Sequence, residues 1–230
     1  MSSIINNSLR KLLIYDQKKD WDKKALEIMK DSELILDAGC GLGRFISQNP
    51  DKIIGLESNP ANLRACEKKG YKVTSGNLTN IPFENEKFDG IYCSHVIEHL
   101  NHSELHQTLE EFNRILKNNG WLIIAAPLLW KHFYSDLTHV RPYNPESLIH
   151  YLVNGTQRTK KIISQDYKIV EIYWRHTPLP RLLFNNYNNN LLRSFFGIFL
   201  GIIDGILYKL HFNFFLPKNG YMLTLKKCSK

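Results

Sequence analysis

Glycines near residue 40 and a carboxylate at residue 57 are residue types that bind nucleotides. The loop reads Asp37-Ala38-Gly39-Cys40-Gly41-Leu42-Gly43. Glycines at a turn from strand to helix let the backbone approach a ligand closely, and the first N–H groups of the helix are free to bind it. Glu57 follows Asp37 by twenty residues, and a carboxylate at the end of a second strand can accept both hydroxyls of a ribose. This pairing predicts a site for an adenosine-containing ligand.

A second group of reactive side chains lies in residues 128–143, a stretch rich in aromatic residues and histidine that we call the aromatic segment. Within it Asp136, His139 and Arg141 offer an acid, an imidazole and a guanidinium. Histidine is the commonest general base, so we expect His139 to accept a hydroxyl proton. Arg141 is expected to pair with an anionic group of the acceptor, with His132 and Asp136 as further acceptor-binding residues. The alternative is a packed lid in which Asp136 and Arg141 form a structural ion pair.

The elements that position these groups follow an α/β rhythm. Short apolar runs predict strands over residues 33–37, 52–57, 71–74, 88–94 and 121–126. Helices are expected over residues 42–48, 60–69 and 103–117. The last of these has Ser103 as its N-cap, an apolar stripe at helical spacing, and its end at Asn119-Gly120. Strands that alternate with helices form parallel βαβ units, so the fold class is α/β. A further helix is expected over residues 145–153, and strands near residues 168–174 and 221–227.

The glycine loop is more compact than the loop that binds dinucleotides. A dinucleotide fingerprint reads GxGxxG, whereas this loop reads GxGxG with Asp37 two residues ahead of it. This form resembles motif I of the class I S-adenosylmethionine-dependent methyltransferases. The resemblance implies that S-adenosylmethionine is the cofactor and that Asp37 holds the ammonium of its methionine moiety, directly or through water. An oxidoreductase that binds a dinucleotide is the fallback.

Further segments resemble successive signatures of the type 11 methyltransferases. They are residues 76–83, 87–91, 94–100 and 116–122. The resemblance implies a doubly wound, mostly parallel seven-stranded sheet of the Rossmann-like methyltransferase type, with an antiparallel last strand. It places the following residues at the cofactor: Asp37, Gly39, Cys40, Gly41, Gly43, Glu57, Ser58, Asn77, Leu78, Ser94 and His95.

Two of these positions need comment. Asn77 stands where the family often has Asp to bind the adenine amino group, and its side-chain oxygen can accept the same hydrogen bond. His95 would lie near the transferring methyl group, which makes it a second candidate catalytic residue beside His139. His99, at the start of the following helix, is expected to be structural.

The run Asp136-Leu137-Thr138-His139-Val140-Arg141-Pro142 suggests an acceptor. It is similar to a segment of methyltransferases associated with bacterial surface-polysaccharide assembly. That narrower resemblance implies O-methylation of a glycan or a lipid-linked saccharide intermediate. Methylation of a lipid such as a quinone precursor is the alternative. A cofactor-binding module without catalysis is less favoured, because Asp37, Glu57 and the glycine loop are all intact.

Charge is unevenly distributed along the 230 residues. Residues 1–130 carry 16 Lys/Arg against 17 Asp/Glu, whereas residues 131–230 carry 14 against 5. A one-sided positive field favours an anionic acceptor or an acidic membrane surface, although a solvated lysine-rich surface is the plainer explanation. The chain shows no separate RNA-binding motif, so no nucleic-acid partner is expected.

Cysteine and histidine spacing predicts neither disulfides nor a metal site. The four cysteines are scattered, without a CxxC pair or histidines at ligand spacing, which is typical of free thiols in a reducing compartment. The first residues lack the features of a signal peptide. We therefore expect a cytoplasmic protein without metal-binding residues.

The chain is expected to divide into an N-terminal helical segment (1–32), a cofactor-binding α/β core (33–127) and a C-terminal part (128–230). The C-terminal part completes the sheet and carries insertions over 128–143 and 178–217. Residues 194–217 are apolar and predict a helix whose one side holds Asp204 and glycines and whose other side holds Phe and Ile. Such a helix would cap the acceptor pocket or lie in the inner face of a membrane; packing on the core or on a second subunit is the alternative. The oligomeric state stays open.

Overall fold

The computed structural model describes residues 17–155, 162–177 and 216–229, together with positions 199, 200, 203 and 206. By internal contacts the chain divides into a larger unit, residues 21–173 with 220–230, and a smaller unit, residues 1–20 with 174–219. The candidate site residues of the sequence all lie in the larger unit. The three-part division expected from the sequence stays a prediction.

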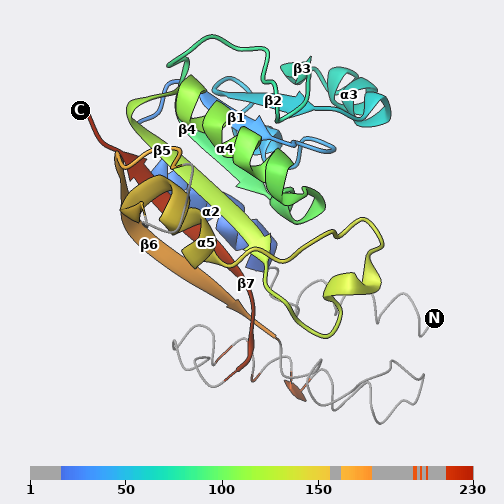
Figure 1. Ribbon diagram of the computed structural model, residues 1–230. Coiled ribbons are helices and arrows are strands. Elements are labelled where there is room, and N and C mark those ends of the chain that lie inside the picture. The colour runs from blue at the N-terminus through green and yellow to red at the C-terminus, as the bar shows by residue number, and fades with distance from the viewer. Residues whose placement is uncertain are drawn as a thin grey trace, which may run out of the picture. The chain divides into compact units, whose positions relative to one another are not determined.

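A seven-stranded sheet forms the centre of the fold (Figure 1). Its strands are β1 (Ile35–Ala38), β2 (Ile53–Glu57), β3 (Val73–Ser75), β4 (Phe88–Ser94), β5 (Leu116–Pro127), β6 (Tyr167–His176) and β7 (Lys218–Lys227), in the order β3-β2-β1-β4-β5-β7-β6. Strands β3, β2, β1, β4 and β5 pair in parallel in that order, and β7 pairs with β5 antiparallel. The predicted doubly wound α/β fold is confirmed. Strands β1 and β4 are parallel neighbours at the centre of the sheet, so their carboxyl ends lie at the same edge.

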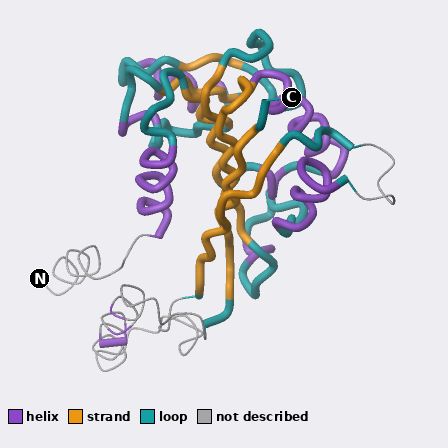
Figure 2. The backbone as a smooth tube through the Cα atoms, turned by 90° about the vertical axis from the view of Figure 1, so that its left-hand side faces the viewer, coloured by secondary structure: helices purple, strands orange, loops and turns teal. Residues whose placement is uncertain are grey.

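Helices cover both faces of this sheet (Figures 1 and 2). The helices are α2 (Gln17–Ile28), α3 (Pro60–Glu67), α4 (His102–Ile115) and α5 (Pro145–Ile149). Single turns are η1 (Ile46–Gln48), η2 (Ile97–His99), η3 (Phe133–Ser135) and the π-helical η4 (His150–Asn154). Helix α2 lies on one face of the sheet and α4 on the other.

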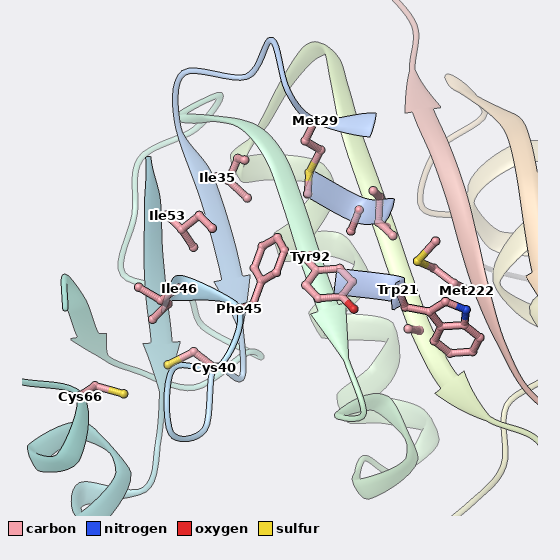
Figure 3. Close-up of a cluster of buried hydrophobic side chains, with 13 residues drawn as sticks. Trp21, Met29, Ile35, Cys40, Phe45, Ile46, Ile53, Cys66, Tyr92 and Met222 are labelled. Carbon is pink, nitrogen blue, oxygen red and sulfur yellow. The ribbon is translucent and has the colours of Figure 1, made fainter. Parts of the chain in front are cut away.

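The core between α2 and the sheet lies directly beneath the glycine loop (Figure 3). Trp21 of α2 and Met29, which directly follows that helix, are buried there, and Met29 fills the space beside Gly90 of β4. The rings of Phe45 and Tyr92 pack with their centroids 4.4 Å apart. Phe45 follows the loop and Tyr92 belongs to β4, so this apolar contact fixes the loop against the central strand.

The N-cap of helix α4 lies two residues before the predicted one. Asn101 is the N-cap, and its side chain and that of Glu104 form a reciprocal capping box. The prediction of Ser103 was wrong because the Asn two residues earlier satisfies two orphan N–H groups at once. The apolar stripe is confirmed, since the following residues are buried: Leu105, Leu109, Phe112 and Ile115.

The end of α4 also differs from the prediction. The helix ends at Ile115 and the chain enters β5 at once, rather than stopping at Asn119-Gly120. Lys227 of β7 donates hydrogen bonds to the carbonyls of Asn113 (2.7 Å) and Leu116 (2.8 Å). A cation at a helix C-terminus satisfies free carbonyls and the helix dipole, so a side chain from the last strand caps α4.

Two other expectations concern helices. Residues 42–48 form a turn and the 3₁₀ turn η1 instead of a helix, because Gly41 and Gly43 adopt left-handed φ angles of 54° and 76° that interrupt helical hydrogen bonding. In the stretch 194–217, positions 199, 200, 203 and 206 are helical, and Phe199 and Ile206 are exposed; most of its remaining positions lie outside the described residues. Among the helices that are described, none has the length and apolar character needed to cross a bilayer.

Candidate active site

The glycine loop presents its backbone at the carboxyl end of β1. Gly39, Gly41 and Gly43 all have left-handed φ angles, and the N–H groups of Gly39 and Cys40 donate to the carbonyl of Leu56 at 2.9 and 3.1 Å. A Cβ atom on Gly39 would lie 2.6 Å from Cγ2 of Val96. By contrast, a Cβ on Gly41 would meet nothing within 4 Å. The loop is thus packed against the protein at Gly39 and open above Gly41, as a ligand-binding loop requires.

Glu57 closes this loop from the end of β2. Its Oε2 accepts the N–H of Gly41 at 2.8 Å, and its Oε1 accepts the N–H groups of Ser58 (2.9 Å) and Asn59 (2.8 Å). A carboxylate offers about four acceptor positions, so Oε2 keeps one for a ribose hydroxyl. The predicted pairing of loop and acid is present, with the acid already held in place by backbone donors.

Asp37 lies buried below the loop, and burial, with nearby Asp22, raises its pKa to about 8. Asp22 of α2 is fully buried, forms an ion pair with Arg44 and accepts the hydroxyl of Tyr92 at 2.9 Å. Arg44 lowers the pKa of Asp37 but does not offset burial. The sequence analysis missed Asp22 and Arg44, because their pairing joins a helix and a loop that no local pattern connects. An ammonium beside Asp37 would favour its charged form.

The adenine side of the site shows a local turn. Asn77 is exposed, and its Oδ1 accepts the N–H of Thr79 at 3.2 Å, which leaves one lone pair of that oxygen for a ligand. Leu78 is 8% exposed and turns inward. Ser58 follows Glu57 with its side chain exposed. These positions fit the predicted cofactor roles, which stay predictions.

Ser94 and His95 mark the carboxyl end of β4. His95 adopts a left-handed φ of 58°, which is uncommon for a residue with a side chain. Its Nδ1 lies 3.1 Å from Oε1 of Glu98, whose side chain is 1% exposed. The backbone bend and this contact together direct the His95 ring toward η2 instead of along the strand.

The aromatic segment is attached to η2 by backbone hydrogen bonds. The carbonyl of Glu98 accepts the N–H groups of Val140 (2.8 Å) and Arg141 (3.2 Å). The hydroxyl of Tyr143 donates to the carbonyl of Leu100 at 3.0 Å. Residues about forty positions apart in the chain are thereby brought beside the end of β4.

His139 is held with one ring nitrogen bonded and the other directed away. Its Nδ1 lies 2.7 Å from the carbonyl of Phe133, so Nδ1 carries the proton and Nε2 has the free lone pair. The ring also packs against those of Phe133 and His99, at 4.7 and 5.0 Å between centroids. Nε2 lies 3.9 Å from Oδ2 of Asp136. This is the orientation that a general base at Nε2 needs.

The other acceptor-side residues are exposed. Asp136 accepts the N–H and hydroxyl of Thr138 at 2.9 and 2.6 Å rather than pairing with Arg141, which removes the structural ion pair that was the alternative. The Arg141 guanidinium lies 5.8 Å from the ring centroid of Tyr143. His132 lies beside Trp130, with 4.9 Å between ring centroids. Arg141 and His132 therefore stay accessible to an acceptor.

Comparisons with known proteins match this architecture. Residues 36–124 match a family model described as a methyltransferase domain. A tRNA (carboxymethyluridine(34)-5-O)-methyltransferase of Arabidopsis thaliana is 29% identical over 131 residues, covering 55% of this chain and 32% of that protein. A phthiotriol/phenolphthiotriol dimycocerosates methyltransferase of Mycobacterium leprae is 30% identical over 117 residues, covering 46% and 42%. The chain thus spans less than half the length of these curated relatives.

Solved structures agree on the fold. A SAM-dependent methyltransferase from Archaeoglobus fulgidus superposes with a TM-score of 0.66 at 22% identity, covering 92% of this chain and 94% of that one. Residues 36–124 thus resemble a methyltransferase domain, and the sheet order and the glycine loop agree with that match. The matches point to S-adenosylmethionine as the methyl donor, and the open backbone above Gly41 and the remaining acceptor position on Glu57 fit this cofactor.

Proposed function

We propose that this protein transfers the methyl group of S-adenosylmethionine to a hydroxyl oxygen of a glycan or lipid-linked saccharide. The observation that carries the proposal is the orientation of His139, whose Nδ1 is bonded to the carbonyl of Phe133 so that Nε2 carries the lone pair, on a segment bonded to η2 just after β4. The C-terminal edge of an open α/β sheet is where ligands bind. An imidazole directed away from its backbone anchor at that edge suits deprotonation of a hydroxyl.

In the proposed reaction the acceptor oxygen attacks the methyl carbon in line with the carbon–sulfur bond. The new C–O bond forms as the C–S bond breaks, and its electron pair stays on sulfur, which leaves S-adenosylhomocysteine. The hydroxyl proton passes to Nε2 of His139 and then to water. Asp37 and Glu57 hold the two ends of the donor, so alignment of donor and acceptor supplies much of the rate.

The aromatic segment supports an acceptor that is partly apolar and partly anionic. Four of its large hydrophobic side chains are exposed: Leu129 (63%), Tyr134 (59%), Leu137 (98%) and Val140 (53%). Arg141 is exposed beside them and can pair with a phosphate or carboxylate. A lipid-linked saccharide with a phosphate combines these features and would bring the protein to the cytoplasmic face of a membrane.

The relatives favour two competing acceptors. The Mycobacterium leprae relative is named for a lipid, and the Arabidopsis thaliana relative is named for a tRNA. The expectation that nucleic acid is excluded therefore gains no support, and the 14 Lys/Arg against 5 Asp/Glu in residues 131–230 suit an anionic acceptor such as RNA or a phosphorylated saccharide. A lipid or quinone precursor stays the alternative to the glycan.

The test is to incubate the full chain with S-adenosylmethionine labelled in its methyl group and with separate lipid-linked saccharide, lipid and RNA extracts. Base-stable label in the saccharide fraction is expected for an ether product. Label in RNA alone, lost when salt is raised, would replace the glycan by a nucleic acid. A Glu57→Gln variant, which impairs the donor site, sets the background.

A further inference from the structure

We propose that Glu98, His99 and His139 bind a divalent transition-metal ion of the zinc type. One ligand atom from each of the three lies within 4.8 Å of those of the other two. Glu98 and His99 belong to η2, whereas His139 comes from the aromatic segment. The hydrogen bonds between Glu98 and residues 140–141 close the forty-residue gap, so no spacing in the sequence announces the set.

Both histidines have the orientation of metal ligands. Nδ1 of His99 lies 3.1 Å from the carbonyl of Thr138, and Nδ1 of His139 lies 2.7 Å from that of Phe133. A carbonyl only accepts, so each Nδ1 carries the proton and each Nε2 presents a lone pair. Metal-binding histidines almost always donate their other N–H to such a partner, which fixes the tautomer and the ring.

Glu98 supplies an independent indication. Its side chain is 1% exposed, and Oε1 contacts Nδ1 of His95 at 3.1 Å. Oε2 is buried and has no hydrogen-bond partner among the residues that the structure describes. A buried carboxylate oxygen left unpaired is destabilising, and native structures rarely contain one without an ion, water or catalytic role to explain it. A cation shared with the two imidazoles satisfies this oxygen.

The ligand types select the metal. Two imidazoles and one carboxylate are the protein ligands of catalytic zinc sites, which keep a further position open for water or substrate. Imidazole also suits iron, nickel and cobalt, whereas magnesium and calcium take oxygen ligands. Zinc is therefore expected to bind and magnesium is not.

The role of the ion in catalysis rests on the proposed function. An ion at the open position polarises the acceptor hydroxyl and lowers its pKa. Because Nε2 of His139 binds the ion in the metal-loaded protein, water there takes the hydroxyl proton that Nε2 accepts in the metal-free protein. Metal binding itself does not depend on the acceptor, so it is measured without turnover.

The experiment titrates zinc into the chelator-treated full chain against a chromophoric competitor, with magnesium in parallel. The wild type is expected to bind one zinc per chain and no magnesium. Glu98→Gln, His99→Asn and His139→Asn should each lower zinc affinity by at least the about 10–100-fold that loss of an outer partner causes. Zinc should also raise the unfolding temperature of the wild type more than that of these variants.

His106→Gln is the matched control, because His106 pairs with Glu110 on α4 at 3.4 Å and belongs to no three-ligand group within the described part of the chain; it should bind zinc as the wild type does. Each variant is checked for binding of S-adenosylhomocysteine, and a variant that fails this check is judged unfolded. The remaining variants then decide whether the zinc site exists. Absence of zinc binding in the wild type, or equal binding in all folded variants, overturns the site. Either result leaves the saccharide labelling test untouched, so the two proposals fail separately.

Discussion

The cofactor side and the acceptor side of this site are built in different ways. On the cofactor side, Glu57 and the glycine loop sit on neighbouring strands and are joined by backbone N–H groups. On the acceptor side, η2 and the aromatic segment are about forty residues apart and are joined by hydrogen bonds at the carbonyl of Glu98 and between His99 and Thr138. The first side is preformed by local geometry, and the second depends on how a long connection packs.

Because of this difference, substitutions on the two sides are expected to affect cofactor binding and turnover separately. Changes on the cofactor side should act on affinity for S-adenosylmethionine or on stability. Changes on the acceptor side should act on turnover while affinity for the donor stays near that of the wild type.

His139→Asn should lower kcat by about 100-fold or more, the scale of a lost general base or its equivalent. Binding of S-adenosylhomocysteine, measured by calorimetry, should stay near that of the wild type. His106→Gln should leave both quantities unchanged. A near-normal kcat in the His139 variant would show that this residue takes no part in the chemistry. It would also contradict the assignment of turnover to the acceptor side.

Glu57→Gln should weaken cofactor binding by about 100-fold, because a hydrogen bond to a charged group contributes about 1.5–3 kcal/mol and the new NH₂ cannot accept from Gly41 or from the ribose. Equilibrium binding of S-adenosylhomocysteine measures the loss. Glu67→Gln, on the exposed side of α3, is the matched change and should bind normally. Equal affinity in the two variants would contradict the assignment of Glu57.

Gly39→Ala should destabilise the fold by more than Gly70→Ala. Both residues have left-handed φ angles, 77° and 75°, which cost an alanine about 1–2 kcal/mol. Only at Gly39 does the new methyl meet a neighbour, Cγ2 of Val96 at 2.6 Å, whereas nothing lies within 4 Å at Gly70. Urea unfolding curves compare them; equal losses would mean that Val96 does not constrain the loop.

Asp37→Asn should flatten the dependence of stability on pH. Because the pKa of Asp37 is raised from 3.8 to about 8, the folded protein holds a proton that the unfolded chain has released between those values. The free energy of unfolding therefore falls as pH rises from about 4 to about 8, and Asn removes this decline. Asp51→Asn, an exposed change, should retain the wild-type slope in urea unfolding at several pH values.

The sequence predicted the cofactor side well because its signals are local. Gly39, Gly41 and Glu57 lie within about twenty residues, and the strand–turn–strand rhythm around them needs no distant contact. Errors arose where two local signals competed. Asn101 displaced Ser103 as the cap of α4, and the left-handed glycines broke the expected helix over residues 42–48.

The acceptor side was only partly predictable. His139 and Asp136 were singled out as reactive types, whereas Glu98 was passed over and His99 was expected to be structural. The sequence around η2 suggests that this carboxylate is a surface residue, whereas its side chain is buried in the folded protein. Asp22 escaped for the same reason, since its partner Arg44 is twenty-two residues away and its burial is a property of the packed core.

The left-handed backbone at His95 has a consequence for how this chain can change. A residue with a Cβ in that conformation is destabilised by about 1–2 kcal/mol relative to glycine, and His95 is the residue through which the strand end meets Glu98. Glycine at this position would relieve the backbone, but it would also remove the ring that contacts Glu98. A His95→Gly substitution would thus exchange backbone strain for the loss of that contact.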